Sequence, residues 1–176
     1  DVIIVGAGSV GVPVALSLTQ MGFRPLVLDR FPSPGQGENK HAIGGIRATH
    51  SDPAKILTCK RSLEIFSTWE EKNGDDIEWL RGGYSFVAYR EQEEMALKSI
   101  LPVQKQYGLD IDYHPAEKIG ELLPGINPCN LLGGTFSPDD GSASPLLSTN
   151  AMYRKAVENG ATFHFKEEVQ KILHED

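Results

Sequence analysis

The hydrophobic pattern of the first thirty residues predicts a strand, a helix and a second strand. Residues 1–5 (DVIIV) and 25–29 (PLVLD) are short apolar runs, typical of strands buried on both faces of a parallel sheet. Between them, residues 9–21 carry apolar side chains at helical spacing, and Gly22 follows as a candidate C-cap. The three elements fit within thirty residues and therefore predict a βαβ unit with a parallel strand pair.

The pattern beyond residue 30 predicts a long loop and then further helices and strands. Residues 31–51, rich in Gly, Pro, Asn and Ser, read as an ordered or ligand-holding loop, and Asp52 with Pro53 marks the start of a helix. The other expected elements are a strand at 84–89, a helix at 91–107 interrupted by Pro102, a strand at 131–137, a helix at 145–158 and a strand at 162–166.

Composition narrows the class of protein. The chain has 176 residues and a net charge of −7, which fits one soluble domain and gives no basic surface for nucleic acid. Residues 2–23 are uncharged but contain four glycines and a proline, so we expect neither a membrane span nor a signal peptide. The spacing of Cys59 and Cys129 predicts no disulfide framework and no metal site, and a reducing, cytoplasmic location is expected.

A glycine-rich fingerprint lies between the first strand and the first helix. Gly6-Ala7-Gly8-Ser9-Val10-Gly11 is a G-x-G-x-x-G sequence, in which Gly6 allows a tight turn, Gly8 admits a pyrophosphate, and Gly11 lets helix and strand pack closely. The helix N-terminus then favours an anion. Asp29 follows Gly11 by eighteen residues and can bind a ribose diol while repelling a 2′-phosphate. The fingerprint predicts FAD or NAD rather than NADP; the alternative is a glycine turn that binds nothing. Pro13 is expected to distort the second helical turn.

Longer motifs resemble one flavoenzyme family. DVIIVGAGSVG, VLD, GENKHAIGGIRATHSD, ELLPGI and GSASPLLSTNAMYRKAVENGATFHFKEEVQKI are similar, in order and spacing, to segments of the FAD-dependent amine and amino-acid oxidoreductases, which include glycine oxidase, sarcosine oxidase and dehydrogenase, and D-amino-acid oxidase. The resemblance implies an α/β fold: a Rossmann-like parallel-sheet FAD-binding domain with an inserted substrate-side region, truncated at the C-terminus. The expected division is residues 1–80 (FAD domain, first part), 81–137 (substrate side) and 138–176 (return to the FAD domain).

The resemblance also assigns cofactor contacts residue by residue. It implies that Ser9 and Val10 supply backbone donors beside the pyrophosphate, and that Asp29 and Arg30 lie at the ribose and adenine. Lys40 and His41 are expected in a loop at the phosphates and flavin edge, and Gly44, Gly45 and Ile46 along the isoalloxazine ring. Val169 is expected to contact adenine through its backbone.

Two side chains near the implied flavin carry specific hypotheses. His41 begins His-Ala-Ile-Gly, which resembles the His-Ala-Ala-Gly stretch that carries covalent flavin in sarcosine and dimethylglycine dehydrogenases. Lys40 stands where those enzymes have tryptophan, and the alternative is a histidine that only hydrogen-bonds the cofactor or backbone. Arg47 is a candidate for holding an anionic group, with a structural ion pair as the alternative. No catalytic residue is otherwise assigned.

The implied reaction is oxidation of a small amine or amino acid (sarcosine, glycine, proline or a D-amino acid), with hydride transfer to flavin N5. The fragment alone is expected to be inactive, and assembly with unidentified subunits is open. Three other functions stay open: an NAD-dependent dehydrogenase, a flavoprotein acting on a hydroxy acid or glycerol phosphate, and a nucleotide-binding subunit whose cofactor is structural.

Overall fold

The computed structural model of the chain describes residues 2–173 and divides them into two units. The first unit comprises the described residues up to Gly44, residues 75–78 and the described residues from Ala143 onward; the second comprises Gly45–Gly74 and Trp79–Ser142. These limits differ from the domain limits expected at residues 80/81 and 137/138. The functional roles assigned to those three segments stay predictions.

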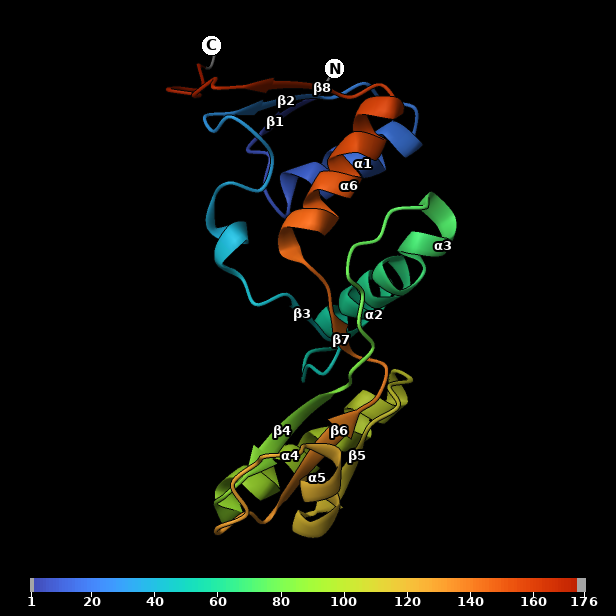
Figure 1. The fold of residues 1–176 in the computed structure, drawn as a ribbon, viewed down its shortest axis with the longest axis vertical. Helices are drawn as coiled ribbons and strands as arrows, with labels where there is room; N and C mark the ends of the chain where they lie inside the picture. The colour runs from blue at the N-terminus through green and yellow to red at the C-terminus, as the bar shows by residue number, and fades with distance from the viewer. Residues whose placement is uncertain (1, 174–176) are drawn as a thin grey trace. The chain divides into compact units, whose positions relative to one another are not determined.

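The first unit is a parallel sheet with two helices. Strands β1, β2 and β8 pair in that order, and both pairs are parallel. Helices α1 and α6 lie side by side on one face of this sheet (Figure 1). The elements of the unit are β1 (Ile3–Val5), α1 (Gly11–Gln20), β2 (Leu26–Asp29), the 3₁₀ helix η1 (Glu38–His41), α6 (Pro145–Glu158) and β8 (Thr162–Phe165). The predicted βαβ unit and the α/β fold class are confirmed.

Local sequence explains where the two long helices of this unit begin and end. The Ser144 hydroxyl accepts a hydrogen bond from the Leu147 amide, and Pro145 occupies the first turn, where its missing amide costs nothing. Gly160 follows α6 with φ +103°, and Gly22 follows α1 with φ +89°, both in the left-handed region that glycine adopts freely. Pro13 does not interrupt α1, which runs from Gly11 to Gln20 with Pro13 in its first turn, where proline is tolerated.

The expectation that the first strand is buried on both faces is wrong. Ile3 and Val5 are 66% and 61% exposed, whereas Val27 in β2 is fully buried. Alternate residues of a strand point to opposite faces, so Ile3 and Val5 share the face away from Ile4, whose side chain reaches the start of α1 at Gly11. Among the described residues, α1 and α6 cover only the face that receives Ile4.

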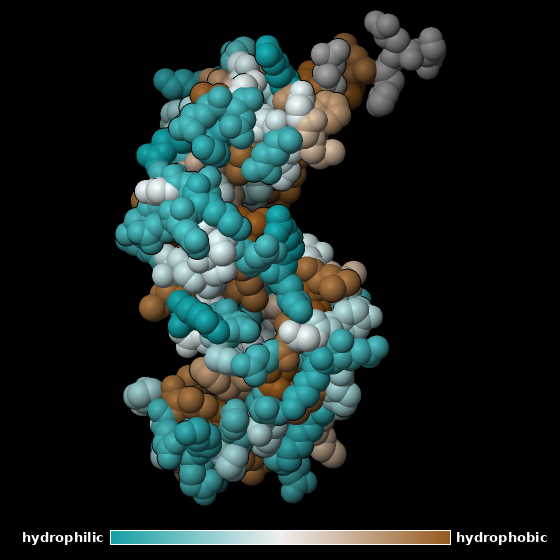
Figure 2. All heavy atoms as spheres, turned by 90° about the vertical axis from the view of Figure 1, so that its right-hand side faces the viewer, coloured by the Kyte–Doolittle hydropathy of each residue, from teal (hydrophilic) through white to brown (hydrophobic). Residues whose placement is uncertain are grey.

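The second unit is built around an antiparallel sheet in the order β4-β6-β5, with α4 and α5 packed against it, and a separate pair β3–β7. Its core contains Ile56, Trp69, Ala88, Ile111 and Ile119, all buried. Hydrophilic side chains cover much of the face drawn in Figure 2, and apolar residues reach the surface there in several patches. The elements are β3 (Gly45–Ile46), α2 (Pro53–Ser67), α3 (Trp69–Asn73), β4 (Tyr84–Ala88), α4 (Glu91–Gln106), β5 (Asp112–Pro115), α5 (Ala116–Leu122), β6 (Gly133–Ser137) and β7 (Gly141–Ser142).

The predicted start of α2 is confirmed: Asp52 Oδ1 accepts a hydrogen bond of 3.0 Å from the Lys55 amide, and Pro53 opens the helix. The predicted interruption of the helix at Pro102 is wrong. Helix α4 runs through Pro102 from Glu91 to Gln106. A proline inside a helix removes one backbone hydrogen bond, and here the packing of α4 against β4, β5 and β6 offsets that cost.

Candidate functional site

The glycine-rich turn joins β1 to α1. Gly6 has φ +102°, and its amide donates a 2.8 Å hydrogen bond to the Leu28 carbonyl of β2. At Gly11 an added Cβ would lie 3.0 Å from the Gly6 carbonyl carbon and 3.2 Å from Ile4 Cγ2, and closer still to the Gly6 oxygen. At Gly8 an added Cβ would meet no heavy atom within 4 Å. The three glycines therefore have separate roles: conformation at Gly6, close packing at Gly11 and open space at Gly8.

The start of α1 faces a cavity of about 250 Å³ lined by the turn and by part of the following loop. No side chain caps the helix at Val10. The first amides of a helix lack intrahelical partners and carry a partial positive charge, so this end can accept an anion such as a pyrophosphate. The lining residues are Val5, Gly6, Gly8, Ser9, Val10, Gly11, Gly37, Glu38 and Asn39.

Asp29 ends β2 and binds the turn directly. Its Oδ2 accepts a 2.6 Å hydrogen bond from the Ala7 amide, and its Oδ1 accepts a 2.7 Å bond from the Phe31 amide. A carboxylate offers about four lone-pair sites, so Asp29 can keep both bonds and still accept from a ribose diol. The sequence fingerprint indicated the ribose role but not this second one, which is to fix the shape of the glycine turn.

A second cavity, of about 350 Å³, extends from the turn past Asp29. The chain leaving β8 forms one wall, since the Glu167 amide donates 3.0 Å to the Asp29 carbonyl. Arg30 and Val169, which are far apart in sequence, both line this cavity, and their contacts with adenine stay predictions. Arg30 lies 3.8 Å from the Glu168 carboxylate and over the Phe31 ring at 4.9 Å. Phe31, Gly37, Glu167 and Glu168 also line it and were not singled out from the sequence.

The loop expected at the phosphates and flavin edge is anchored by a residue that the sequence analysis did not select. The Asn39 side-chain amide donates to the Pro145 carbonyl at 2.9 Å and to the Thr149 hydroxyl at 2.8 Å, which ties η1 to α6. Lys40 and His41, in the same 3₁₀ helix, are exposed and line neither of the two cavities. Their contacts with a flavin stay predictions.

Gly44, Gly45 and Ile46 are held by the chain itself. Gly44 has φ +78°, its carbonyl accepts a 3.0 Å hydrogen bond from the Ala143 amide, and a Cβ on it would crowd Ala143. In the second unit, Gly45 and Ile46 pair with Ser142 and Gly141 in the antiparallel β3–β7 ladder. Gly44 thus has a structural reason to lack a side chain, and the predicted contact of the segment with the isoalloxazine ring is a separate hypothesis.

Arg47 follows β3 in the second unit. Its guanidinium lies 5.0 Å from the centre of the Phe86 ring and 5.4 Å from that of Tyr84, and Nη1 donates a 2.6 Å hydrogen bond to the Thr49 carbonyl. No acidic side chain among residues 2–173 lies within 4 Å of it, so the alternative of a structural ion pair is not what this part of the chain shows. A cation held on aromatic rings, with donors beyond its one carbonyl bond, suits recognition of an anion.

The residues of the first unit fit the adenosine diphosphate part of a dinucleotide. Gly8 leaves space that a side chain would fill, an uncapped helix end faces the same space, and Asp29 stands at the end of β2 with a cavity beside it. The acids Asp29, Glu167 and Glu168 around that cavity disfavour a 2′-phosphate, because like charges repel. FAD can be held here by its phosphates and adenosine.

A family model described as "FAD dependent oxidoreductase" (DAO) matches residues 1–176. The chain belongs to this family. The expected cofactor, FAD, is thereby confirmed for the family to which the chain belongs; a covalent link is a separate question.

Three relatives illustrate the match. Mitochondrial sarcosine dehydrogenase from Mus musculus is 24% identical over 162 residues, which are 92% of this chain and 18% of that protein. The mitochondrial pyruvate dehydrogenase phosphatase regulatory subunit, also from Mus musculus, is 24% identical over 98% of this chain and 20% of that protein. The crystal structure of L-proline dehydrogenase from P. horikoshii superimposes with a TM-score of 0.93 at 28% identity and covers 100% of this chain and 46% of that one.

The chain therefore spans about a fifth of the length of these two sequence relatives and less than half of the solved structure. In residues 2–173 no helix is both long and apolar enough to cross a membrane.

Proposed function

We propose that the protein of which this chain is part oxidises a small amine or amino acid with FAD. When bound, FAD supplies a hydride acceptor, so that the carbon next to nitrogen loses a hydride and the nitrogen a proton, giving an imine that water hydrolyses. The observation that carries the proposal is the glycine turn with open space at Gly8 and Asp29 bonded to its backbone. It is supported by the family match and by relatives named for sarcosine and L-proline.

The proposed roles of the chain's residues divide between the two units. In the first unit, the turn from Gly6 to Gly11 holds the pyrophosphate and Asp29 orients the ribose, while Arg30 and Val169 border the adenine. In the second unit, Arg47 holds a small anionic group, with the carboxylate of an amino-acid substrate as the proposed one, because a guanidinium keeps its charge and can grip a carboxylate with two hydrogen bonds.

We propose further that FAD is held without a covalent bond. His41 is exposed and, among the described residues, forms no side-chain hydrogen bond that would fix its ring, and Lys40 replaces the tryptophan of the covalent flavoenzymes. Acid precipitation of the full-length protein should release all flavin into the supernatant. Flavin that remains in the pellet, and is lost from it in His41→Ala, would show that the link exists.

Anaerobic absorbance spectroscopy of the purified full-length protein tests the main proposal. A flavin spectrum that is bleached by sarcosine, glycine, proline or a D-amino acid is the expected result. Bleaching by a hydroxy acid or glycerol phosphate instead would replace the proposed amine or amino-acid substrate with that class of substrate. A colourless protein that binds NAD would overturn the flavin assignment.

A second candidate function is a flavoprotein that does not turn over a substrate. The similarity to a protein named as a regulatory subunit favours keeping it, because that match covers 98% of this chain. Bound flavin that dithionite reduces but no amine, amino acid or hydroxy acid reduces is the result that would favour this candidate. The free cysteines Cys59 and Cys129 support the cytoplasm as the proposed location, which cell fractionation tests.

A further inference from the structure

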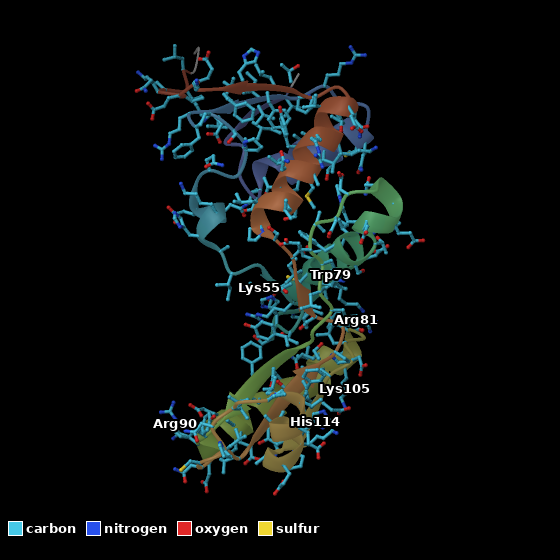
Figure 3. The ribbon with its side chains drawn as sticks, viewed as in Figure 1. Lys55, Trp79, Arg81, Arg90, Lys105 and His114 are labelled. Carbon is cyan, nitrogen blue, oxygen red and sulfur yellow. The ribbon has the colours of Figure 1, made fainter. Side chains whose placement is uncertain are left out.

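The second unit contains a buried carboxylate directly across a strand pair from Arg47. In the β3–β7 ladder Ile46 pairs with Gly141, so the next position on each strand places Asp140 opposite Arg47. The Asp140 backbone is fixed independently, because its carbonyl accepts a 2.8 Å hydrogen bond from the Gly83 amide. Strand β7 also bridges to Leu80, between Trp79 and Arg81 (Figure 3).

The Asp140 carboxylate has fewer partners than a buried charge needs. The residue is 0% exposed; Oδ1 accepts a 2.9 Å hydrogen bond from the Ala48 amide, and Oδ2 is buried with no hydrogen-bond partner among the described residues. An ionised carboxylate is costly to bury with so few partners. Burial accordingly raises the pKa of Asp140, although the Ala48 amide, Thr49 and the positive charge of Arg47 act in the opposite direction.

The hydrogen bond from the Ala48 amide connects Asp140 to the backbone segment that holds the Arg47 side chain in place. Ala48 is the residue after Arg47, and Thr49, whose carbonyl accepts from Arg47 Nη1, is the next one. One buried side chain thus fixes the backbone on which Arg47 depends, while the rings of Tyr84 and Phe86 support the guanidinium itself.

We propose that Asp140 is a positioning residue for Arg47, and that its charge sets how tightly the Arg47 guanidinium binds a small carboxylate. The inference rests on the anion-binding role proposed above for Arg47. When Asp140 is ionised, its negative charge offsets part of the attraction between Arg47 and a ligand anion. When it takes up a proton, that offset disappears, and an oxygen remains to accept the Ala48 hydrogen bond. Anion affinity therefore rises as the pH falls.

Other charged groups near Asp140 must be separated from it. One cavity, of about 280 Å³, is lined by Asp140 and by five charged side chains from α2 and from the segments around β4, β5 and β7: Lys60, Glu64, Arg81, Asp110 and Asp139. Arg81 pairs with Asp139, and Glu64 with Arg61. His50 lies on the Arg47 side; burial, then Arg47 and Lys55, lower its pKa, and it too gains positive charge in acid.

Binding of trifluoroacetate, followed by ¹⁹F NMR on the full-length, FAD-loaded protein between pH 8 and 4.5, tests the proposal. This anion stays ionised over the whole range, so its own titration does not contribute. Wild-type affinity should rise as the pH falls. Asp140→Asn, which keeps an oxygen for the Ala48 amide, should bind more tightly than wild type at pH 8, by up to about tenfold, the effect of one pKa unit of coupling between charges. The exposed neighbour variant Asp139→Asn removes a like charge that raises the pKa of Asp140, so it should keep the wild-type rise in affinity with its midpoint shifted to lower pH.

Wild-type and Asp140→Asn profiles that coincide would overturn the proposal, as would unchanged trifluoroacetate affinity in Arg47→Gln. Because binding is measured without turnover, these failures are distinct from a failure of the proposed oxidase function, which would show as flavin that no amine bleaches. Should Asp140→Asn not fold, the ¹⁵N–¹H shifts of the Ala48 amide and Arg47 Nε in the wild-type protein serve instead. They should titrate with one shared midpoint, and separate midpoints would refute the coupling.

Discussion

Two glycines of the same turn should respond in opposite ways to a side chain. Gly8 has open space around an added Cβ, and its φ lies outside the left-handed region, so Gly8→Val places its branched side chain in the cavity rather than against the protein. Gly11 has no such space, because even the Cβ of Gly11→Ala would press against the Gly6 carbonyl and Ile4 Cγ2. One substitution therefore tests the ligand's place and the other tests the packing of helix on strand.

The magnitudes follow from these surroundings. Gly8→Val should change the free energy of unfolding of the apoprotein by no more than about 0.5 kcal/mol, as for a substitution that meets no neighbours. The same variant should weaken FAD binding by about 3 kcal/mol or more, roughly 100-fold, because the valine takes the pyrophosphate's place. Gly11→Ala should destabilise the apoprotein by about 2–4 kcal/mol, at or above the usual cost of overpacking, since the obstacle is backbone that must move.

Denaturant unfolding of the apoproteins and fluorescence titration with FAD measure the two quantities separately. The expected pattern is a stable Gly8→Val protein that does not retain flavin and a Gly11→Ala protein that is less stable. A Gly8→Val protein that keeps full flavin content would refute the assignment of this turn to the pyrophosphate. A Gly11→Ala protein as stable as wild type would refute the close packing.

Three further predictions concern single side chains. Asp29→Ala should weaken FAD binding by ~1–3 kcal/mol and also loosen the turn, which loses the acceptor of the Ala7 amide; equal affinity for FAD in the two proteins would contradict this. Asn39→Ala should cost about 1–2 kcal/mol of unfolding free energy through two lost hydrogen bonds, measured by denaturant unfolding. The pKa of His50 is lowered in the folded protein, so its contribution to the free energy of unfolding is present above pH 6.5 and is lost as the pH falls through the folded-state pKa. His50→Gln should therefore lose less unfolding free energy than wild type across that window, as measured by denaturant unfolding. An unchanged loss would exclude His50 as its source.

Local sequence signals, such as proline or glycine at the end of a helix, predicted the limits of their elements well. Pro145 and the Asn159-Gly160 pair set the limits of α6, which runs from Pro145 to Glu158 as expected. The strand at β5 and the helix α5 were missed, because residues 112–115 (DYHP) show no clear alternation and form a strand only where β6 offers a partner, with Asp112 opposite Phe136. The exposure of Ile3 and Val5 depends on which elements cover the sheet, and no pattern within β1 contains that information.

The residues of the candidate site also form two groups: those that a local sequence pattern predicts and those that depend on contacts between distant segments. The glycines and Asp29 could be found from the sequence because their spacing reflects one βαβ unit. The contacts of Asn39 with α6 and of Asp140 with Ala48 span more than ninety residues of sequence and depend on tertiary structure. Asp140 lies in the sequence Pro-Asp-Asp-Gly, which is typical of an ordinary turn, and only its burial distinguishes it from the exposed Asp139.

Equilibrium binding of FAD to the apoprotein of the full-length protein, with ADP as competitor, tests the central claim most directly. The turn and Asp29 are proposed to hold the adenosine diphosphate half of the cofactor, so we expect one FAD per chain and competition by ADP. A protein that takes up no FAD, or one whose bound FAD is unaffected by saturating ADP, would contradict the account.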